Sequence, residues 1–274
     1  MPPLDPLDAD WLRICRRIVD AHREIFESAP GSAERTVFEG RGRGGDRTLE
    51  IDRLCEDAVF AELEALAADG ASFLAISEER GEVPFGEGGP ARVVIDPIDG
   101  SLNARRTLPS HSLSIAVASG PAMSDVEWGY VHDFGAGEEF VAARGEGALL
   151  DGKAIRVAAD GERLEVLGIE AAEPEWSLRA LPALSGRVYR LRVVGSIAIS
   201  AAYVAAGRFD GLMALRPCRS VDAAAAQLLV REAGGEVAFG DLTLAQAGLD
   251  LDARYPISAA PGPEALATIR AAAG

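Results

Sequence analysis

The sequence predicts an α+β fold with a mixed sheet in its N-terminal lobe and a second, smaller sheet in its C-terminal lobe. Three observations support this class. Two amphipathic stretches open the chain, short β-branched segments follow to about residue 144, and helical and strand patterns then alternate to the end. Because no linker, repeat or low-complexity tract interrupts the chain, we expect residues 1–274 to form a single unit with lobes at 1–150 and 151–274.

The two N-terminal helices are predicted from apolar residues that recur at three- and four-residue spacing. Between residues 10 and 27 these residues alternate with charges, and Asp8 or Asp10 is suited to cap the helix. A second helix is expected from about residue 52 to residue 68, where an Asp-Gly pair ends the pattern.

Short β-branched segments separated by turn residues predict a largely antiparallel sheet. They cover residues 72–77, 92–95, 112–118, 126–133 and 138–144. Past residue 150, strand patterns at 165–170, 190–195, 209–215 and 235–239 alternate with helical patterns at 174–184, 196–206, 222–233 and from 263 onward. This alternation predicts the second sheet.

The composition is that of a globular protein, with 48% hydrophobic and 26% charged residues. Three widely spaced cysteines form no C-x-x-C pair, so neither a zinc site nor a disulfide framework is indicated, and a reducing cytoplasm is expected. The N-terminus lacks a signal-peptide pattern and no stretch reaches the roughly 20 apolar residues that span a bilayer, so we expect no membrane partner.

The net charge of -16 excludes a nucleic-acid binder that neutralises phosphates with a broad basic face. The average field of such a chain also repels a small anion. A phosphate-handling site in this protein therefore needs local positive charge from a metal ion or from clustered arginines.

Two carboxylates, Asp96 and Asp99, lie in the segment VVIDPIDGS. The β-branched run before them predicts a buried strand, and Pro97 is expected to end its ladder while Gly100 permits a tight turn. Both acids should thus lie on a stiff loop at the carboxyl edge of a strand, which is where open α/β sheets bind ligands.

Other acids occupy similar positions at the ends of predicted elements. Asp46 precedes the second helix, Glu78 and Glu79 follow the strand at 72–77, and Asp222 opens an alanine-rich helix. Taken singly, each has a structural explanation as a helix cap, a loop residue or a solvated turn. Taken together, several carboxylates at strand ends repel one another unless a cation lies between them.

The types of side chain favour Mg²⁺ over Zn²⁺, because hard divalent ions take oxygen ligands and the strand ends that contain these acids have no histidine or cysteine grouped with them. The three histidines, His22, His111 and His132, are not suitably grouped for zinc, and we expect them to be surface or core residues.

Five stretches occur in the order GGDRTLEID, ISEERG, DPIDGSLNA, VVGSIAISAAYVAAGRFDG and SVDAAAAQLLVREAGG, between about residues 44 and 235. This set resembles the inositol monophosphatase and fructose-bisphosphatase superfamily of metal-dependent, lithium-sensitive sugar phosphatases. Its motifs are most similar to those of the bifunctional inositol-monophosphatase/fructose-1,6-bisphosphatase branch first recognised in archaea. The resemblance implies a layered α-β-α-β-α sandwich and a homodimer. It also implies a hydrolase that removes phosphate from fructose 1,6-bisphosphate, inositol monophosphate or another small phosphate ester by attack of a metal-activated water.

By the same resemblance, Glu78, Asp96 and the backbone carbonyl of Ile98 are expected to bind one Mg²⁺, while Asp96, Asp99 and Asp222 bind a second. Two or three ions per site are expected, with Mn²⁺ as a substitute.

The resemblance also implies which residues act on water and phosphate. Asp46 and Ser101 correspond to the pair that orients the attacking water, and Glu79 is expected to support water activation or to bind another ion. The backbone N–H groups of Gly100 and Ser101, beside Asp99, are expected to hold the phosphate, particularly if a helix starts there.

A bisphosphate needs a second anion pocket, and bidentate arginine is suited to it. Arg192 and Arg216 are the candidates, with Ser196 as a polar contact at a helix start.

Three positions depart from the family pattern, and one of them, Val221 in place of the usual tryptophan before Asp222, alters packing rather than ion binding. Leu49 replaces a threonine that often accompanies the upstream aspartate, so Asp52 rivals Asp46 for its role. Leu215 stands near the place where animal inositol phosphatases have an acidic residue for the inositol hydroxyls. This argues against specificity for inositol alone.

Two alternatives have to be weighed. A haloacid-dehalogenase-like phosphatase forms an aspartyl phosphate, but its two acids are two positions apart rather than three, and Glu78-Glu79 has no place in that scheme. A regulatory protein that binds a metal or a phosphosugar without catalysis could share the fold. Such proteins are expected to have lost a ligand, whereas every acidic position is present here.

Overall fold

The computed structural model of the chain describes residues 4–41, 47–170 and 173–273. Its α-helices are α1 (Trp11–Ser28), α2 (Glu50–Ala68), α3 (Ser101–Arg105), α4 (Pro174–Leu184), α5 (Ile197–Ala205), α6 (Ser220–Glu232) and α7 (Pro263–Ala273). Short 3-10 helices are η1 (Pro6–Asp8), η2 (Glu34–Thr36) and η3 (Met123–Asp125). Asp10 caps α1 by accepting a hydrogen bond from the backbone N–H of Arg13, as the sequence predicts.

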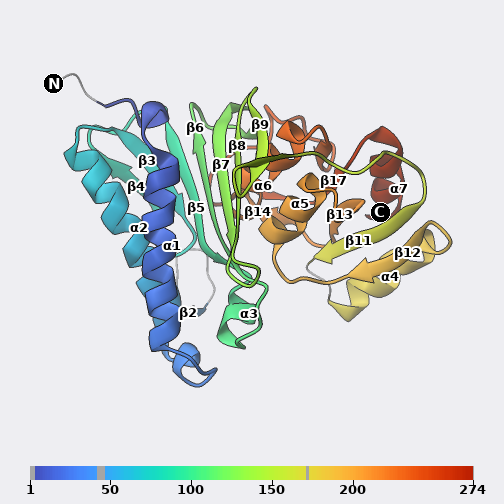
Figure 1. Cartoon of the computed structure of the whole chain (residues 1–274), viewed down its shortest axis with the longest axis horizontal. Helices are drawn as coiled ribbons and strands as arrows, with labels where there is room; N and C mark the ends of the chain where they lie inside the picture. The colour runs from blue at the N-terminus through green and yellow to red at the C-terminus, as the bar shows by residue number, and fades with distance from the viewer. Residues whose placement is uncertain (1–3, 42–46, 171–172, 274) are drawn as a thin grey trace.

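The elements are stacked in five layers (Figure 1). Helices α1 and α2 cover one face of an eight-stranded sheet, and α5 and α6 lie between that sheet and a five-stranded one. Helices α4 and α7 cover the far side of the second sheet. The predicted α-β-α-β-α sandwich with a smaller second sheet is confirmed.

The first sheet has the strand order β10-β9-β8-β7-β6-β5-β3-β4. Its strands are β3 (Phe73–Ser77), β4 (Gly81–Phe85), β5 (Arg92–Asp99), β6 (Ser112–Ala118), β7 (Val126–Asp133), β8 (Glu138–Ala143), β9 (Gly147–Leu150) and β10 (Lys153–Ile155). The pair β3–β5 is parallel and the other neighbours are antiparallel, which confirms the largely antiparallel prediction. The sheet extends to Ile155, slightly beyond the predicted lobe boundary.

The second sheet has the order β12-β11-β13-β17-β15. Its strands are β11 (Leu164–Glu170), β12 (Val188–Arg192), β13 (Gly211–Ala214), β15 (Glu236–Phe239) and β17 (Ile257–Ala260). Two small pairs complete the strands, β1 (Phe38–Arg41) with β2 (Arg47–Leu49) and β14 (Cys218–Arg219) with β16 (Arg254–Tyr255).

Strand β5 continues through Pro97 to Asp99, which corrects the prediction that the strand ends at Ile95. The three steps from Asp96 to Asp99 face two steps of β6, so the ladder has a bulge at this point. A proline is tolerated at a bulge because the extra residue is outside the regular hydrogen-bond ladder. The two carboxylates therefore lie on a strand of fixed register and not on a loop.

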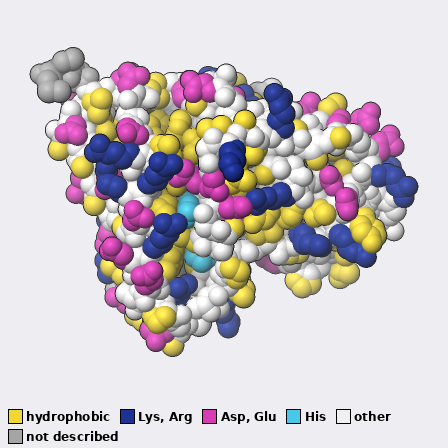
Figure 2. Space-filling view, in the orientation of Figure 1, with side chains coloured by type: hydrophobic (Ala, Val, Ile, Leu, Met, Phe, Trp, Pro, Cys, Tyr) yellow, Lys and Arg dark blue, Asp and Glu magenta, His cyan; other side chains and the backbone are white. Residues whose placement is uncertain are grey.

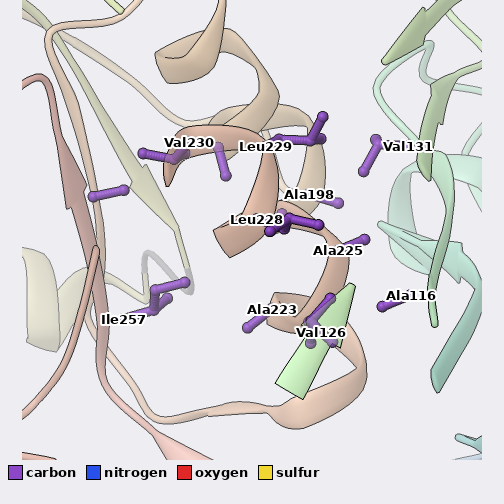
Figure 3. Packing of buried hydrophobic residues seen from close by; sticks show 14 of the residues in the cluster. Ala116, Val126, Val131, Ala198, Ala223, Ala225, Leu228, Leu229, Val230 and Ile257 are labelled. Carbon is purple, nitrogen blue, oxygen red and sulfur yellow. The ribbon is translucent and has the colours of Figure 1, made fainter. Parts of the chain in front are cut away.

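Helix α6 packs closely against the first sheet because small residues line the contact. A Cβ on Gly129 of β7 would lie 3.0 Å from the carbonyl oxygen of Ala225. Figure 3 shows Ala225 and Leu228 of α6 with Ala116 of β6 on one side and Ile257 of β17 on the other. The middle layer is thus packed against both sheets, and the first turn of α6 is held in a fixed position.

The three histidines lie in the interior around the ring of Phe134. The ring centroids of His22, His111 and His132 lie 5.8, 5.4 and 4.9 Å from that of Phe134. His22 Nε2 lies 2.9 Å from the carbonyl oxygen of Cys55, so this nitrogen donates its hydrogen to the carbonyl. The sequence predicts surface or core positions for the three histidines, and the structure places all of them in the core.

The surface mixes charges of both signs. Figure 2 shows acidic and basic side chains interspersed over one face of the molecule. Of the helices in the described ranges, none combines the length and the apolar character needed to cross a membrane.

Candidate active site

The acids that the sequence predicts to act together meet at one edge of the first sheet. Strands β3 and β5 are parallel neighbours with Ser77 opposite Ile95, so their carboxyl ends lie side by side. Glu78 directly follows β3, Asp96 directly follows Ile95, and Asp222 comes from the first turn of α6. One carboxylate oxygen from each of these three acids lies within 4.8 Å of the other two.

Asp99 completes the group at the end of β5. It is buried, and its negative charge contributes to raising the pKa of both Asp96 and Asp222. Its Oδ2 accepts hydrogen bonds from Ser196 Oγ at 2.6 Å and from the backbone N–H of Ala198 at 2.7 Å, at the start of α5. Ser196 is 1% exposed and also caps α5, so the structure places its hydroxyl against Asp99.

The electrostatics of the group are those of carboxylates held together against their mutual repulsion. Burial is the first cause that raises the pKa of Asp96 well above its usual range, and the charges of Glu78, Asp99 and Asp222 add to it. Burial followed by the charges of Asp99 and Glu78 raises the pKa of Asp222 to about 7. The guanidinium of Arg219 forms an ion pair with Glu78. Nearby positive charge therefore relieves the repulsion within the group.

The donor set fits a hard divalent cation. The side-chain donors are carboxylate oxygens, without histidine or cysteine, and such ligands suit Mg²⁺ or Mn²⁺ better than Zn²⁺. Within the part of the chain that the structure describes, this is the one group of three or more such side chains close enough to hold an ion. A cation among these acids would also offset the charges that raise their pKa values.

A small cavity of about 90 Å³ adjoins the group. It is lined by Asp52, Glu78, Glu79, Asp96, Pro97, Ile98 and Ser101. A larger hollow of about 770 Å³, beside the N-terminal turn and residues 86–91, contains none of the predicted site residues. The small cavity therefore opens beside the acids, whereas the larger hollow does not.

Gly100 and α3 form the other side of the site. Gly100 has a φ of 87°, and a Cβ there would lie 2.9 Å from the Ser110 carbonyl oxygen and 3.0 Å from that of Gly195, so only glycine fits. Helix α3 begins at Ser101, which meets the condition set by the sequence for phosphate binding, and the side chain of Ser101 is exposed.

The two candidates for the upstream aspartate differ in what can be said of them. Asp46 lies outside the described residues. Asp52 accepts a hydrogen bond from the backbone N–H of Leu49 at 3.1 Å and thereby caps α2. It also lines the cavity, and burial raises its pKa to about 6. Asp52 therefore caps a helix and also lines the cavity, so it stays an alternative to Asp46 as the upstream aspartate.

The structure does not bring the two predicted arginines to the acids. Arg216 is exposed and pairs with Glu173 at 2.5 Å, and Arg192 is exposed and donates to the carbonyl oxygen of Leu191 at 2.9 Å. Their role in a second phosphate pocket stays a prediction.

Two buried acids behind the site were not predicted. Glu56 of α2, 2% exposed, accepts hydrogen bonds from Ser77 Oγ and from the backbone N–H of Arg80 at 3.1 Å, and so supports the turn that contains Glu78. Glu170 ends β11 and is 1% exposed. The sequence contained a signal for each of them. Glu56 is an acid among the apolar positions of a helix, and Glu170 is an acid at the end of a buried strand.

Known proteins resemble this chain along almost its whole length. The model of the Inositol monophosphatase family matches residues 14–273. A protein of Methanothermobacter thermautotrophicus named fructose-1,6-bisphosphatase/inositol-1-monophosphatase is 32% identical over 237 residues, which is 83% of each chain. A protein of the same name from Archaeoglobus fulgidus is 34% identical over 233 residues, 84% of each chain. The crystal structure of the MJ0109 gene product, an inositol monophosphatase–fructose 1,6-bisphosphatase, has a TM-score of 0.82 at 26% identity and covers 96% of this chain and 100% of its own.

The layered fold and its group of clustered carboxylates define a metal-dependent phosphatase, a hydrolase. The match extends over both sheets and the helices around them, so it does not rest on the central motif alone. The chain belongs to the inositol monophosphatase family. Membership of this family does not favour either of the two alternatives from the sequence, a haloacid-dehalogenase-like enzyme or a non-catalytic binding protein.

Proposed function

We propose that the protein is a Mg²⁺-dependent phosphomonoesterase for small sugar or inositol phosphates, with fructose 1,6-bisphosphate and inositol monophosphate as the first candidates. The observation that supports this most is the group Glu78, Asp96 and Asp222, of which Asp96 is buried and the other two are partly buried, beside a cavity that Ser101 also lines. The names of the two archaeal relatives point to the same two substrates.

The ion-binding part of the proposal uses five groups. Glu78, Asp96, Asp99, Asp222 and the carbonyl of Ile98 would hold two or three Mg²⁺ ions, with Mn²⁺ as a substitute. When bound, such ions offset the charge of a phosphate and lower the pKa of a water molecule. Sensitivity to lithium belongs to the same proposal.

The chain's own groups would orient water and phosphate. The exposed hydroxyl of Ser101 can both donate and accept a hydrogen bond, and so can orient a water molecule in the cavity. Glu79, which also lines the cavity, can accept a proton, and Asp46 is proposed as the partner of Ser101. The N–H groups of Gly100 and Ser101 are proposed to hold the phosphate, because the first N–H groups of a helix have no intrahelical acceptor.

Residues around the site help to distinguish an inositol phosphate from a sugar bisphosphate as the substrate. Leu215 is partly buried against the core cluster of the C-terminal lobe, so this position offers no carboxylate to an inositol hydroxyl. For a second phosphate, Arg192 and Arg216 would have to turn from their present partners. Ser196 is held by Asp99, and we assign it to the support of that acid.

We extend the proposal to a homodimer in the cytoplasm. In the described residues, β12 is an outer strand of the second sheet, and Tyr189 and Val193 beside that edge are each 65% exposed. Exposed apolar side chains at a sheet edge are typical of surfaces that pair with another chain.

Phosphate release from fructose 1,6-bisphosphate and from inositol 1-phosphate, measured with Mg²⁺ and with EDTA, tests the proposal. We expect release only with Mg²⁺, and Asp96→Asn should lower kcat/KM by more than about 100-fold because it removes one of the clustered charges. Asp20→Asn, at an exposed position of α1, is the control. Release that persists in EDTA, or in Asp96→Asn, would contradict the proposal. The ratio of kcat/KM for the two substrates ranks them.

A second arm of the same experiment separates water orientation from ion binding. Ser101→Ala should lower kcat by about 100-fold without changing the Mg²⁺ affinity, and Ser101→Thr should keep the activity because it keeps the hydroxyl. An unchanged kcat in Ser101→Ala would remove this residue from the mechanism.

A further inference from the structure

Glu170 is a buried carboxylate that holds a turn of the C-terminal lobe next to the active site. Its Oε1 accepts hydrogen bonds from Ser200 Oγ at 2.5 Å and from the backbone N–H of Val194 at 3.1 Å. Its Oε2 accepts one from the backbone N–H of Gly195 at 2.8 Å. Three donors from two segments therefore converge on one side chain, which joins the turn to helix α5.

The held turn is the part of the C-terminal lobe that reaches Asp99. Ser196, which directly follows Gly195, donates its hydroxyl hydrogen to Asp99. On its other side the turn contacts α3, because Asn103 Nδ2 donates to the carbonyl oxygen of Val194 at 2.8 Å. A displacement of the turn would thus also displace the groups that it contacts, Asp99 and the helix that begins with Ser101.

The turn has little room to move. Gly195 has a φ of 82°, and a Cβ there would lie 2.7 Å from Asn103 Nδ2. The carbonyl oxygen of Gly195 is also one of the two atoms that exclude a side chain at Gly100. In so tight a contact, a shift of a few tenths of an ångström changes the direction of the donors on Asp99.

Hydrogen bonds to a buried carboxylate are strong, and roughly twice as strong as those between neutral groups. A carboxylate without such donors would be costly in the interior. Burial raises the pKa of Glu170 to about 7 in spite of its donors, so the side chain is ionised in a buffer at about pH 8.

We propose that Glu170 is a positioning residue, which fixes the turn from Val194 to Ser196 and thereby sets the orientation of Asp99 for ion binding. The inference rests on the proposed function, because that function assigns Asp99 to the ions. Glu170 itself touches neither substrate nor ions, and it acts through Ser196 and Ala198, which both donate to the same oxygen of Asp99.

The test is the affinity for Mn²⁺, measured at about pH 8 by calorimetry and by the electron paramagnetic resonance of free Mn²⁺. Glu170→Gln keeps the size of the side chain and removes the charge. We expect it to weaken the binding of Mn²⁺ by about 10-fold, the low end of the range found when a direct partner of a metal ligand is removed, because Glu170 acts on Asp99 through Ser196. The loss of activity at low Mg²⁺ should be recovered by raising the Mg²⁺ concentration, with the KM for the phosphate ester little changed.

Controls separate this role from a purely structural one. Glu165→Gln, at an exposed position of the same strand, should bind Mn²⁺ like the wild type. Thermal unfolding in EDTA reports the stability of each variant without ions. If Glu170→Gln does not fold, Ser200→Ala removes one donor only, and should weaken Mn²⁺ binding in the same direction by a few-fold.

Two outcomes would overturn the inference. In the first, Glu170→Gln, or Ser200→Ala in its place, binds Mn²⁺ as tightly as the wild type, even if its unfolding temperature in EDTA is lower. In the second, activity is lost and high Mg²⁺ does not restore it. A wild type that binds no Mn²⁺ would instead refute the proposed function, and this inference with it.

Discussion

Asp222 shows that a single residue can have a structural and a chemical role at once. Its Oδ2 accepts a hydrogen bond from the backbone N–H of Arg219 at 2.9 Å, which caps the start of α6. The same side chain also belongs to the group with Glu78 and Asp96. An acid in the first turn of a helix is stabilised by the helix dipole, so it can be kept there at a modest cost beside other acids. Local pattern alone therefore could not choose between the two interpretations.

His22 gives the protein a predictable pH dependence. Burial in the core lowers its pKa from 6.5 to about 4. Because the folded pKa lies below the unfolded one, the unfolded chain takes up a proton first as the pH falls, and stability is lost. Between about pH 7 and pH 5 this should cost about 2 kcal/mol of unfolding free energy. Urea unfolding of the wild type and of His22→Phe at both pH values measures it.

The comparison with His22→Phe isolates the histidine. The buried carboxylates, whose pKa values are raised, act in the opposite direction, since their folded forms bind protons more readily as the pH falls. They are present in both proteins, so their effect cancels in the difference. Equal losses in the two proteins, or an imidazole of His22 that is protonated near pH 5 by NMR, would refute the prediction.

At the scale of elements, the sequence is most informative where the hydrophobic pattern is strong. The predicted bounds of β6, β7 and α4 agree with the structure residue for residue. Strand β4 is not predicted because Pro84 and flanking glycines indicate a turn, and β17 is not predicted because two of its four residues are alanines with little β preference. The bulge in β5 is not predicted either, since it depends on the register with β6.

The same reasoning applies to the elements of the site. Glu78, Asp96, Asp99 and Asp222 could be predicted because each ends or begins a strongly patterned element. Glu170 could not, because its function depends on a turn that follows β12, more than 20 residues along the chain. Its sequence neighbourhood shows only that it ends a buried strand.

The packing of α6 against β7 can be tested at Gly129. Gly129→Ala would place a Cβ 3.0 Å from the carbonyl oxygen of Ala225, and so push α6 from the sheet. We expect a loss of about 1–3 kcal/mol in unfolding free energy, measured by urea denaturation, and a lower Mn²⁺ affinity because Asp222 moves with the helix. Gly161→Ala is the matched control, since a Cβ there meets nothing within 4 Å. Equal stabilities of the two variants would show that the contact is not tight.

At the scale of the whole molecule, the site joins segments that are far apart in the chain. Glu78, Asp96 and Asp99 come from the first sheet or the turn after β3, whereas Asp222 comes from α6, which lies between the two sheets. A core cluster likewise includes residues of both sheets and of the helices between them. An ion that binds all these acids would therefore hold the first sheet and the middle helices together.

Ions should accordingly raise the stability of the whole chain. With Mg²⁺ at about 100 times its dissociation constant, the unfolding free energy should increase by about 2.7 kcal/mol. Urea denaturation with Mg²⁺ and with EDTA, followed by tryptophan fluorescence and by circular dichroism, measures the increase. In Asp96→Asn the gain should be much smaller. Two separate transitions, of which Mg²⁺ shifts only one, would contradict the expectation that residues 1–274 act as a single unit.

The close packing of α6 also tells a protein engineer where this scaffold can be varied. Enlarging any residue of the alanine run from Ala223 to Ala226, all at most 1% exposed, would push α6 from the elements it packs against and displace Asp222 in its first turn. Leu102, in the short helix that begins at Ser101, and Leu108, just after it, are by contrast 56% and 51% exposed. A mutant library aimed at new substrates should therefore leave the middle layer untouched and randomise the rim around α3.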